Sequence, residues 1–356
     1  MALRRARSVV AGLVASAAVL AAPLPAHAGA ASGEQASGSA FVALGDSYAS
    51  GLGTRSYLAD GTSCRRSTYA HPALVAAARG LQLNFRACSG ATTADVAALQ
   101  LGALGSATTH VSLTVGGNDA GFADVLTECA QPAWMSSCTA AIDRAQKVID
   151  GTLPGRLSSL YAAVTSRAPA ARVVVAGYPR IFNGKDCNAL TWFSPTEMSR
   201  LNATADLLNT RIAAAASAAG VVFVDPTAAF TRHAVCDTAA WVNGLSDPVA
   251  ESYHPNRAGQ SSGYTPLVGT ALTSSPVRVT AATRQAAAAA ADELAAQQRE
   301  YAAQDRAIEP ERFVLPDLTS ARARAAAARA GVDLTSRASI DALDRRYELR
   351  QVAAAR

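Results

Sequence analysis

The sequence has none of the short spacings that mark metal, phosphate or thiol-redox sites. It contains no His-Glu-x-x-His pattern and no glycine-rich loop that ends in Gly-Lys-Ser or Gly-Lys-Thr. No two cysteines are separated by two residues, which argues against a zinc site or a thioredoxin-like motif. We therefore expect no metal and no cofactor.

The positive charge is not gathered into a patch. The 356 residues have a formal net charge of +5, and the arginines that supply it are spread along the chain. Because a nucleic-acid site needs a compact basic patch, usually with interleaved aromatic residues, we expect no nucleic acid as a partner. The basic balance is more typical of a solubility feature.

The first residues have the order of a secretory signal. Arginines in the first seven residues precede an apolar stretch, Val9 to Leu20, and a small-x-small site follows at Ala26 to Ala28. This order predicts a signal peptide over residues 1–28, cut near Ala28, a polar linker over 29–38, and a secreted protein. The apolar stretch is shorter than the roughly 20 residues of a membrane-spanning helix. The Sec and twin-arginine export routes both stay open.

Six cysteines agree with export, because disulfides persist in oxidising compartments. Their number leaves several pairings open. The simplest is sequential, which joins Cys64 to Cys88, Cys129 to Cys138 and Cys187 to Cys236. We expect these disulfides to stabilise the fold and to take no part in chemistry.

Short apolar runs alternate with helical stretches between residues 39 and 275. The strands expected are Phe41 to Leu44, Leu81 to Ala87, Val111 to Val115, Arg172 to Ala176 and Val221 to Val224. The helices expected include Pro72 to Arg79, Ala140 to Ser166 with a break near Pro154, and Pro195 to Ala219. Nearly continuous apolar strands indicate a sheet covered on both faces, and the alternation predicts an α/β layered domain with a parallel sheet.

The character of the chain changes near residue 275. Residues 276–356 are rich in alanine and arginine, contain no lysine or cysteine, and have few large apolar side chains. Such a composition predicts helices, broken at Pro310 and Pro316, with too thin an apolar stripe for a core of their own. A solvated tail without function and docking onto the catalytic domain, the cell envelope or a partner are both open.

Chemically active residues follow the ends of the expected strands. Ser47 comes after the first strand, Gly90 after the second and Asn118 after the third, while His254 lies past the last. Because active sites of open α/β sheets lie outside the carboxyl ends of the strands, we expect these four residues at one rim.

These residues are the parts that acyl transfer requires. A serine such as Ser47 becomes a nucleophile when a base such as His254 takes its proton. The main-chain N–H groups of Ser47 and Gly90 and the side-chain NH₂ of Asn118 can bind the oxyanion that forms.

Four blocks in this order resemble those of the SGNH, or GDSL, hydrolase superfamily. They are Gly45-Asp46-Ser47-Tyr48, Gly90, Gly116-Gly117-Asn118-Asp119 and His254, and the resemblance covers roughly residues 38–275. The cysteines and the Ser252-to-Asn256 stretch are similar to the secreted actinobacterial lipase and esterase branch. The resemblance implies a three-layer α/β/α sandwich with a mostly parallel, flavodoxin-like sheet over residues 39–275, followed by a helical extension over 276–356. It also implies ester hydrolysis through an acyl-enzyme, with Ser47, Gly90, Asn118 and His254 in the roles given above.

One position departs from the superfamily pattern. The aspartate usual three residues before the histidine is here Glu251. Either Glu251 orients the imidazole of His254, or a main-chain carbonyl near Ser252 does so. Asp46 and Asp119 are expected to tie down turns. The Gly-x-Ser-x-Gly match at Gly259 to Gly263 follows no strand, so we interpret it as chance.

The function expected is a monomeric secreted lipase or esterase that acts on fatty-acyl esters. A phospholipase A-type activity and a carbohydrate acetyl esterase are alternatives. We expect the acyl groove to be lined by loops after the strands, including the segments that carry Trp134 and Trp192. The alternative from a different class is a catalytically silent envelope-binding module that uses the C-terminal extension as its contact surface.

Overall fold

A parallel sheet of five strands forms the centre of the fold. The computed structural model describes residues 40–354, so the expected signal peptide and linker, residues 1–28 and 29–38, lie outside the described residues. The strand order is β2-β1-β3-β4-β5, which is the flavodoxin-like order. The strands are β1 (Ala40–Gly45), β2 (Gln82–Phe85), β3 (Thr108–Thr114), β4 (Arg172–Ala176) and β5 (Val222–Val224). All five expected strands are present, and every neighbouring pair is parallel.

The apolar sequences of the central strands are explained by their burial, and one edge strand is an exception. Phe41 to Leu44 in β1 and Val111 to Leu113 in β3 are buried, as central strands covered on both faces must be. In contrast, β5 lies at the edge of the sheet and its three residues are only half-buried. Its continuous apolar run alone did not distinguish an edge strand from a central one.

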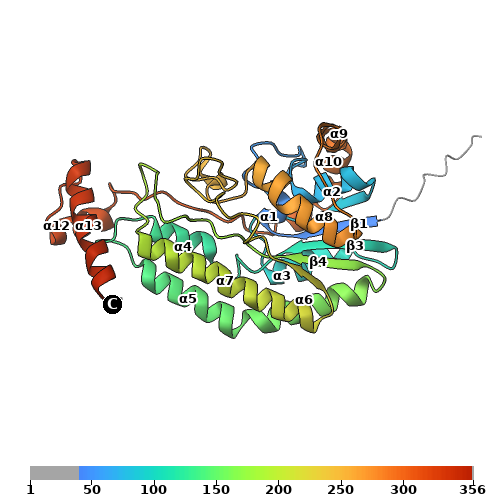
Figure 1. The fold of residues 1–356 in the computed structure, drawn as a ribbon, viewed down its shortest axis with the longest axis horizontal. Coiled ribbons are helices and arrows are strands. Elements are labelled where there is room, and N and C mark those ends of the chain that lie inside the picture. The colour runs from blue at the N-terminus through green and yellow to red at the C-terminus, as the bar shows by residue number, and fades with distance from the viewer. Residues whose placement is uncertain (1–39, 355–356) are drawn as a thin grey trace, which may run out of the picture. The chain divides into compact units, whose positions relative to one another are not determined.

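Helices cover both faces of the sheet (Figure 1). Helices α5, α6 and α7 lie on one side and α2 and α8 on the other, which gives the three-layer sandwich. The helices of this part are α1 (Ser47–Ser50), α2 (His71–Arg79), α3 (Thr93–Asp95), α4 (Phe122–Cys129), α5 (Cys138–Gly151), α6 (Leu153–Arg167), α7 (Pro195–Ala218) and α8 (Thr265–Thr273). Within residues 40–354, no helix has the length and apolar content that crossing a bilayer would need.

Helix α7 begins where its sequence predicts. The hydroxyl of Ser194 accepts a hydrogen bond from the Glu197 main-chain N–H, and the Glu197 carboxylate accepts one from the Ser194 N–H. This reciprocal capping box, with Pro195 as the first helical residue, fixes the start of the helix.

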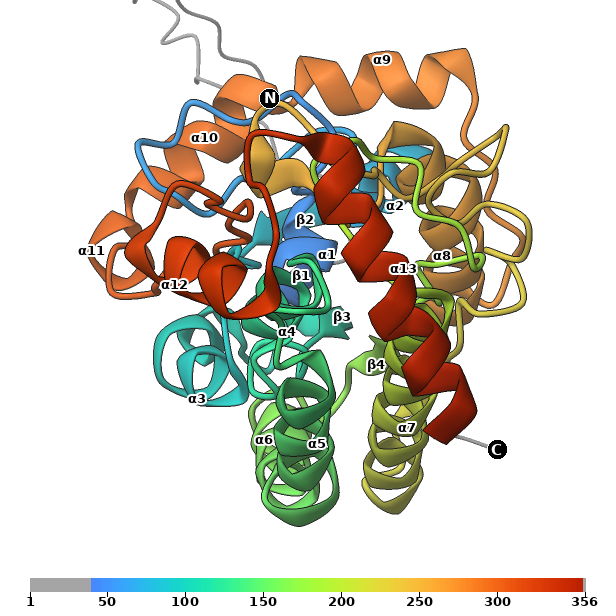
Figure 2. The same ribbon diagram turned by 90° about the vertical axis from the view of Figure 1, so that its left-hand side faces the viewer.

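The C-terminal extension packs against the rest of the chain. Its helices are α9 (Ala281–Ala289), α10 (Ala291–Arg299), α11 (Ala302–Asp305), α12 (Ala321–Ala330) and α13 (Arg337–Ala354). Helix α9 contacts α2, α10 contacts β2, and α13 contacts α7 (Figure 2). The extension is therefore not a solvated tail but docks onto the hydrolase part of the chain, one of the alternatives that the sequence left open. Residues 306–320, which we call the crossing segment, connect α11 to α12.

A buried charge cluster holds the first half of the extension. The carboxylate of Asp305 lies 2.8 Å from the guanidinium groups of both Arg66 and Arg86, and all three side chains are fully buried. Asp60 also pairs with Arg66, at 2.9 Å. The Arg86 guanidinium stacks on the ring of Tyr301, 4.0 Å from its centroid. Two buried arginines therefore share one aspartate of the extension, which Arg66 has in addition to Asp60.

A second hydrophobic cluster holds the other half. Helices α12 and α13 place small and aliphatic side chains against Trp134, Met135 and Trp192, namely Ala323, Ala326, Ala327, Ile340 and Leu343. The indole N–H of Trp192 donates to Asp341, 3.0 Å away. The extension covers both rings, and neither ring lines the apolar cavity that Ser47 lines, so their place in an acyl groove stays a prediction.

Disulfides join Cys64 to Cys88, Cys129 to Cys138 and Cys187 to Cys236, the sequential pairing. The Cys64–Cys88 bond ties a surface loop to the residue that precedes the Ser89-Gly90 turn. Closing loops in this way lowers the entropy of the unfolded chain.

We expect Asp305→Ala to lower the free energy of unfolding by about 3–5 kcal/mol, because it leaves two buried arginines without their shared carboxylate. Asp206→Ala is the matched control, since Asp206 forms a bidentate pair with Arg180 on the surface. That change should cost less than about 1 kcal/mol. Urea unfolding followed by fluorescence measures both, and equal costs for the two variants would contradict the role of Asp305.

Candidate active site

Ser47 is presented by the sharp turn between β1 and α1. Gly45 has a φ of +117°, and a Cβ at this position would collide with the Thr114 carbonyl oxygen on β3. Asp46 caps α1, since its Oδ1 accepts hydrogen bonds from the Tyr48 N–H at 3.0 Å and the Thr114 hydroxyl at 2.6 Å. Ser47 is thereby fixed as the first residue of α1, between the carboxyl ends of β1 and β3.

Asp46 is a structural carboxyl group. Its Oδ2 accepts a hydrogen bond from the Tyr178 hydroxyl, so the carboxyl group has partners on both oxygens. Burial raises the pKa of Asp46 to about 7, against the lowering effect of the hydrogen bonds from Thr114 and Tyr178. The side chain joins the serine turn to the loop after β4, as the interpretation of Asp46 as a turn residue requires.

His254 faces Ser47 with its Nε2 atom. This nitrogen lies 3.0 Å from the Ser47 Oγ, which is hydrogen-bond distance for a general base. The Nδ1 atom lies 2.9 Å from the main-chain carbonyl oxygen of Ser252. Because a carbonyl only accepts, Nδ1 carries a proton, so in the neutral imidazole it is Nε2 that has the lone pair for the serine hydroxyl.

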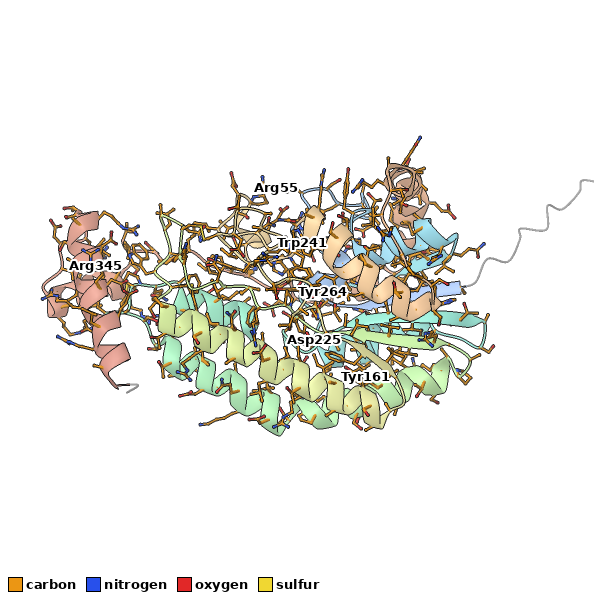
Figure 3. The ribbon with its side chains drawn as sticks, viewed as in Figure 1. Arg55, Tyr161, Asp225, Trp241, Tyr264 and Arg345 are labelled. Atoms are coloured by element: carbon orange, nitrogen blue, oxygen red, sulfur yellow. A yellow bond between two sulfur atoms is a disulfide. The ribbon has the colours of Figure 1, made fainter. Side chains whose placement is uncertain are left out.

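The loop that carries His254 is braced by main-chain hydrogen bonds. The Tyr253 N–H donates to the Asn243 carbonyl and the Asn243 N–H donates to the His254 carbonyl, at 3.0 and 2.9 Å. The Tyr48 hydroxyl, next to the nucleophile, donates to the Tyr253 carbonyl at 3.1 Å. Tyr264, labelled at the centre of Figure 3, packs edge-on against Tyr48. The histidine loop and the serine turn are therefore connected directly.

Glu251 does not contact His254 in the structure. Its carboxylate accepts a hydrogen bond from the Tyr57 hydroxyl at 2.6 Å and lies 3.6 Å from the Nε of Arg55, which Figure 3 labels. The prediction that Glu251 orients the imidazole is therefore wrong. The alternative expected from the sequence, a main-chain carbonyl near Ser252, is the group that contacts the Nδ1 of His254. The side chain is 1% exposed and braces the loop around Tyr57 against the histidine loop.

Gly90 and Asn118 line one cleft, and Asn118 also lines a cavity with Ser47. Gly90 has a φ of +90° in the turn after β2, and Asn118 follows β3. One N–H of the Asn118 amide donates to the Ala91 carbonyl at 3.1 Å, which fixes the amide in the cleft. The other N–H of that amide is the one with which Asn118 can bind an oxyanion.

Glu311, in the crossing segment, also reaches the site. Its Oε1 lies 2.9 Å from the His254 Nε2, the nitrogen that faces Ser47. Burial alone lowers the pKa of His254, but the charge and hydrogen bond of Glu311 and the Ser252 carbonyl raise it above its ordinary value. Burial raises the pKa of Glu311, but His254 and hydrogen bonds from Ser47 and Ser89 bring it below its ordinary value. Sequence reasoning missed Glu311, because no motif surrounds it and it lies outside the hydrolase-like part.

An apolar cavity opens beside Ser47. It passes between α4, α5 and α7, and its lining is mostly aliphatic and aromatic: Phe122, Val125, Ala145, Ile149, Tyr178, Leu201, Ala205 and Leu208. Ser47, Asn118 and Glu311 also line it. The cavity suits an alkyl chain and offers few groups for hydrogen bonding to a sugar.

The remaining polar candidates have structural partners. Asp119 accepts hydrogen bonds from Thr93 and pairs with Arg156, which ties down the turn after β3. Gly259 to Gly263 form a helical turn that leads into α8 and follow no strand, so their Gly-x-Ser-x-Gly match carries no nucleophile. In this turn the Gln260 side chain accepts a hydrogen bond from the His71 N–H, and burial lowers the pKa of His71 to about 4.

Together, the parallel sheet and the serine–histidine pair at its β1/β3 rim define a carboxylic ester hydrolase. The GDSL-like lipase/acylhydrolase family matches residues 43–261, more than half of the chain, and the protein belongs to this family. Residues 276–354 lie beyond the matched range.

Named relatives are streptomycete lipases. The chain is 46% identical to Lipase 1 of Streptomyces coelicolor over 240 residues, which is 66% of this chain and 87% of that protein. An extracellular lipase from Streptomyces rimosus has a similar structure, with a TM-score of 0.62 and 44% identity over 65% of this chain and 99% of that one. Phospholipase A1 from Streptomyces albidoflavus NA297 gives a TM-score of 0.61 and 44% identity over 64% and 97%.

We expect Glu251→Gln to leave the pH profile of ester hydrolysis unchanged, because Glu251 contacts Tyr57 and not His254. In serine proteases, losing the acid that holds the histidine costs about 10⁴-fold in kcat, whereas here kcat/KM should stay within about threefold. Steady-state kinetics between pH 5 and 9 measure both quantities. A large fall in kcat with a shifted pH midpoint would return the orienting role to Glu251.

Proposed function

We propose that the protein hydrolyses fatty-acyl esters through an acyl-enzyme intermediate on Ser47. The observation that carries the proposal is the position of His254 Nε2, 3.0 Å from the Oγ of Ser47, which lines an apolar cavity. The fixed Nδ1–H···O=C bond to Ser252 supports the same assignment, because it holds the imidazole in the tautomer that a general base needs.

The reaction then runs in two acyl-transfer steps. His254 takes the Ser47 proton while the Oγ attacks the ester carbonyl carbon, and the resulting oxyanion is bound by the N–H groups of Ser47, Gly90 and Asn118. His254 returns the proton to the leaving alcohol as the carbon–oxygen bond of the ester breaks. Water then attacks the acyl-enzyme with the help of the same base, which releases the fatty acid and restores Ser47. Each oxyanion donor is worth about 2.7–4 kcal/mol in comparable sites.

The cavity is what favours long acyl chains. An acetyl group needs little buried space, whereas the aliphatic lining between α4, α5 and α7 can cover several methylene groups, each worth about 0.8 kcal/mol on burial. A phospholipase A-type activity is the second candidate. Its support is the similarity to the phospholipase A1 of Streptomyces albidoflavus NA297.

We also propose that the chain is exported, loses its leader near Ala28 and acts as a monomer. The disulfides and the similarity to an extracellular lipase support export. N-terminal sequencing and the mass in solution of the protein recovered from culture medium check both points. Contact of the extension with the cell envelope stays a prediction.

A ladder of p-nitrophenyl esters from acetate to palmitate tests the substrate class. We expect kcat/KM to be greatest at medium or long chains, because the cavity buries the alkyl chain. Ser47→Ala should abolish hydrolysis of every ester with little change in the melting temperature, because the partners of the Ser47 hydroxyl, His254 and Glu311, keep their hydrogen bond to each other. Hydrolysis that survives in Ser47→Ala, or that is confined to acetate, would contradict the proposal.

A second variant separates the cavity from the catalytic pair. Ala205 lines the cavity from α7, so Ala205→Phe places a ring where the alkyl chain would lie. We expect the preferred chain length to shorten while acetate hydrolysis is kept. If the preferred chain length did not change, the cavity would not be the site that binds the acyl chain.

A further inference from the structure

The crossing segment lies over the catalytic pair. In Figure 1 it runs from the α9–α11 side of the molecule past the carboxyl ends of the strands to α12 and α13. The Glu311 carboxylate contacts the His254 Nε2 at 2.9 Å, the Ser89 hydroxyl at 3.5 Å, and the Ser47 hydroxyl through a further hydrogen bond. One side chain of the extension therefore contacts both members of the catalytic pair.

Main-chain atoms of the same segment fill the cleft at Gly90. The Glu309 carbonyl oxygen, the Pro310 Cα and the Glu311 nitrogen lie so close to Gly90 that a Cβ on the glycine would collide with them. Gly90 is a proposed oxyanion donor, and the ester carbonyl of a substrate needs the space beside it. The segment and a substrate therefore exclude each other.

Apolar side chains hold this part of the segment in place. Ile308 is 1% exposed, and Phe313 is buried with its ring edge-on to Tyr253, 5.0 Å between centroids. The Val314 N–H donates to the Thr127 hydroxyl at 3.0 Å. Glu311 thus lies between two buried residues, so its position over the site is fixed on both sides.

The extension is also held at both ends. Asp305 pairs with buried Arg66 and Arg86 before the crossing segment, and α12 and α13 cover Trp134 and Trp192 after it. Tethering at two points gives the segment a high effective concentration at the site. A soluble substrate has to compete with an intramolecular ligand.

Glu311 contacts the wrong nitrogen for a catalytic acid. An acid that orients the histidine binds Nδ1, which here is bound to the Ser252 carbonyl. Glu311 instead occupies Nε2, which must take the proton of Ser47. A carboxylate beside Nε2 also favours the protonated imidazole, and an imidazolium cannot act as a base.

We propose that the C-terminal extension is an intramolecular inhibitor, in which residues 309–313 fill the active site and the Glu311 carboxylate takes the place of the substrate's ester group. The proposal rests on the proposed function, because it takes Ser47 and His254 as the catalytic pair. Hydrolysis then requires the crossing segment to leave the cleft while the folded core stays intact.

The test compares the full-length protein with three full-length variants. Glu311→Gln removes the charge from the site, and a second variant replaces residues 309–313 with a flexible glycine–serine segment of equal length. Glu300→Gln is the matched control, because it makes the same chemical change on an exposed side chain of the extension outside the crossing segment. Asp305, α12 and α13 stay unchanged in all of them, and circular dichroism checks that each variant is folded.

Two rates are measured for each protein: labelling of the Ser47 hydroxyl by a fluorophosphonate reagent, and hydrolysis of the p-nitrophenyl ester ladder. We expect Glu311→Gln and the segment replacement to raise both rates by about ten- to a hundredfold, the factor that loss of a charged hydrogen bond corresponds to. The Glu300→Gln rates should equal those of the wild type.

Each other outcome has a definite meaning. Rates that stay at the wild-type value in both variants would overturn the inhibition, and so would a loss of hydrolysis in Glu311→Gln, which would give Glu311 a catalytic role. If labelling of Ser47 accelerates but no ester is hydrolysed, the inhibition is supported and the proposed substrate class fails. The two proposals are therefore tested separately.

Discussion

The hydrogen bond from the His254 Nδ1–H to the Ser252 carbonyl is the interaction on which the site depends. It fixes the tautomer of the imidazole, and with it which nitrogen faces Ser47. A main-chain acceptor has no charge to lose, so this arrangement needs no buried carboxylate at Nδ1. The loop that carries His254 is in turn held by main-chain hydrogen bonds to Asn243 and by the Tyr57–Glu251 hydrogen bond.

By our proposal, the extension controls access to the catalytic pair, whereas Ser47 and His254 remain the reacting groups. Arg66 and Arg86 sit in the hydrolase part but find their carboxylate, Asp305, in the extension. The same is true of Trp134 and Trp192, whose rings are covered by α12 and α13. The Asp305 cluster and the contacts of α12 and α13 are both buried, so the extension is part of the folded core. The crossing segment connects these two contacts and is therefore held across the active site.

Much of the fold was predictable because its signals are local. The runs in β1 and β3 are apolar throughout, and Ser194, Pro195 and Glu197 specify the start of α7. The places of three of the four candidate site blocks were predictable for a related reason. Ser47, Gly90 and Asn118 each follow a strand, and parallel strands end at the same edge, whereas His254 lies on a loop far past β5. The half-buried state of β5 was not, because its place at the edge depends on strand order.

The sequence by itself determined the class of fold and the helical character of the extension, and it singled out Ser47, Gly90, Asn118 and His254 as the candidate site residues. Only the tertiary structure decided that Ser252, and not Glu251, holds the imidazole, because spacing along a loop does not set the direction of a side chain. It alone also brought Glu311 to the His254 Nε2, across 57 residues of sequence. No local pattern records that contact, since it arises from two separate docking surfaces on either side of the crossing segment.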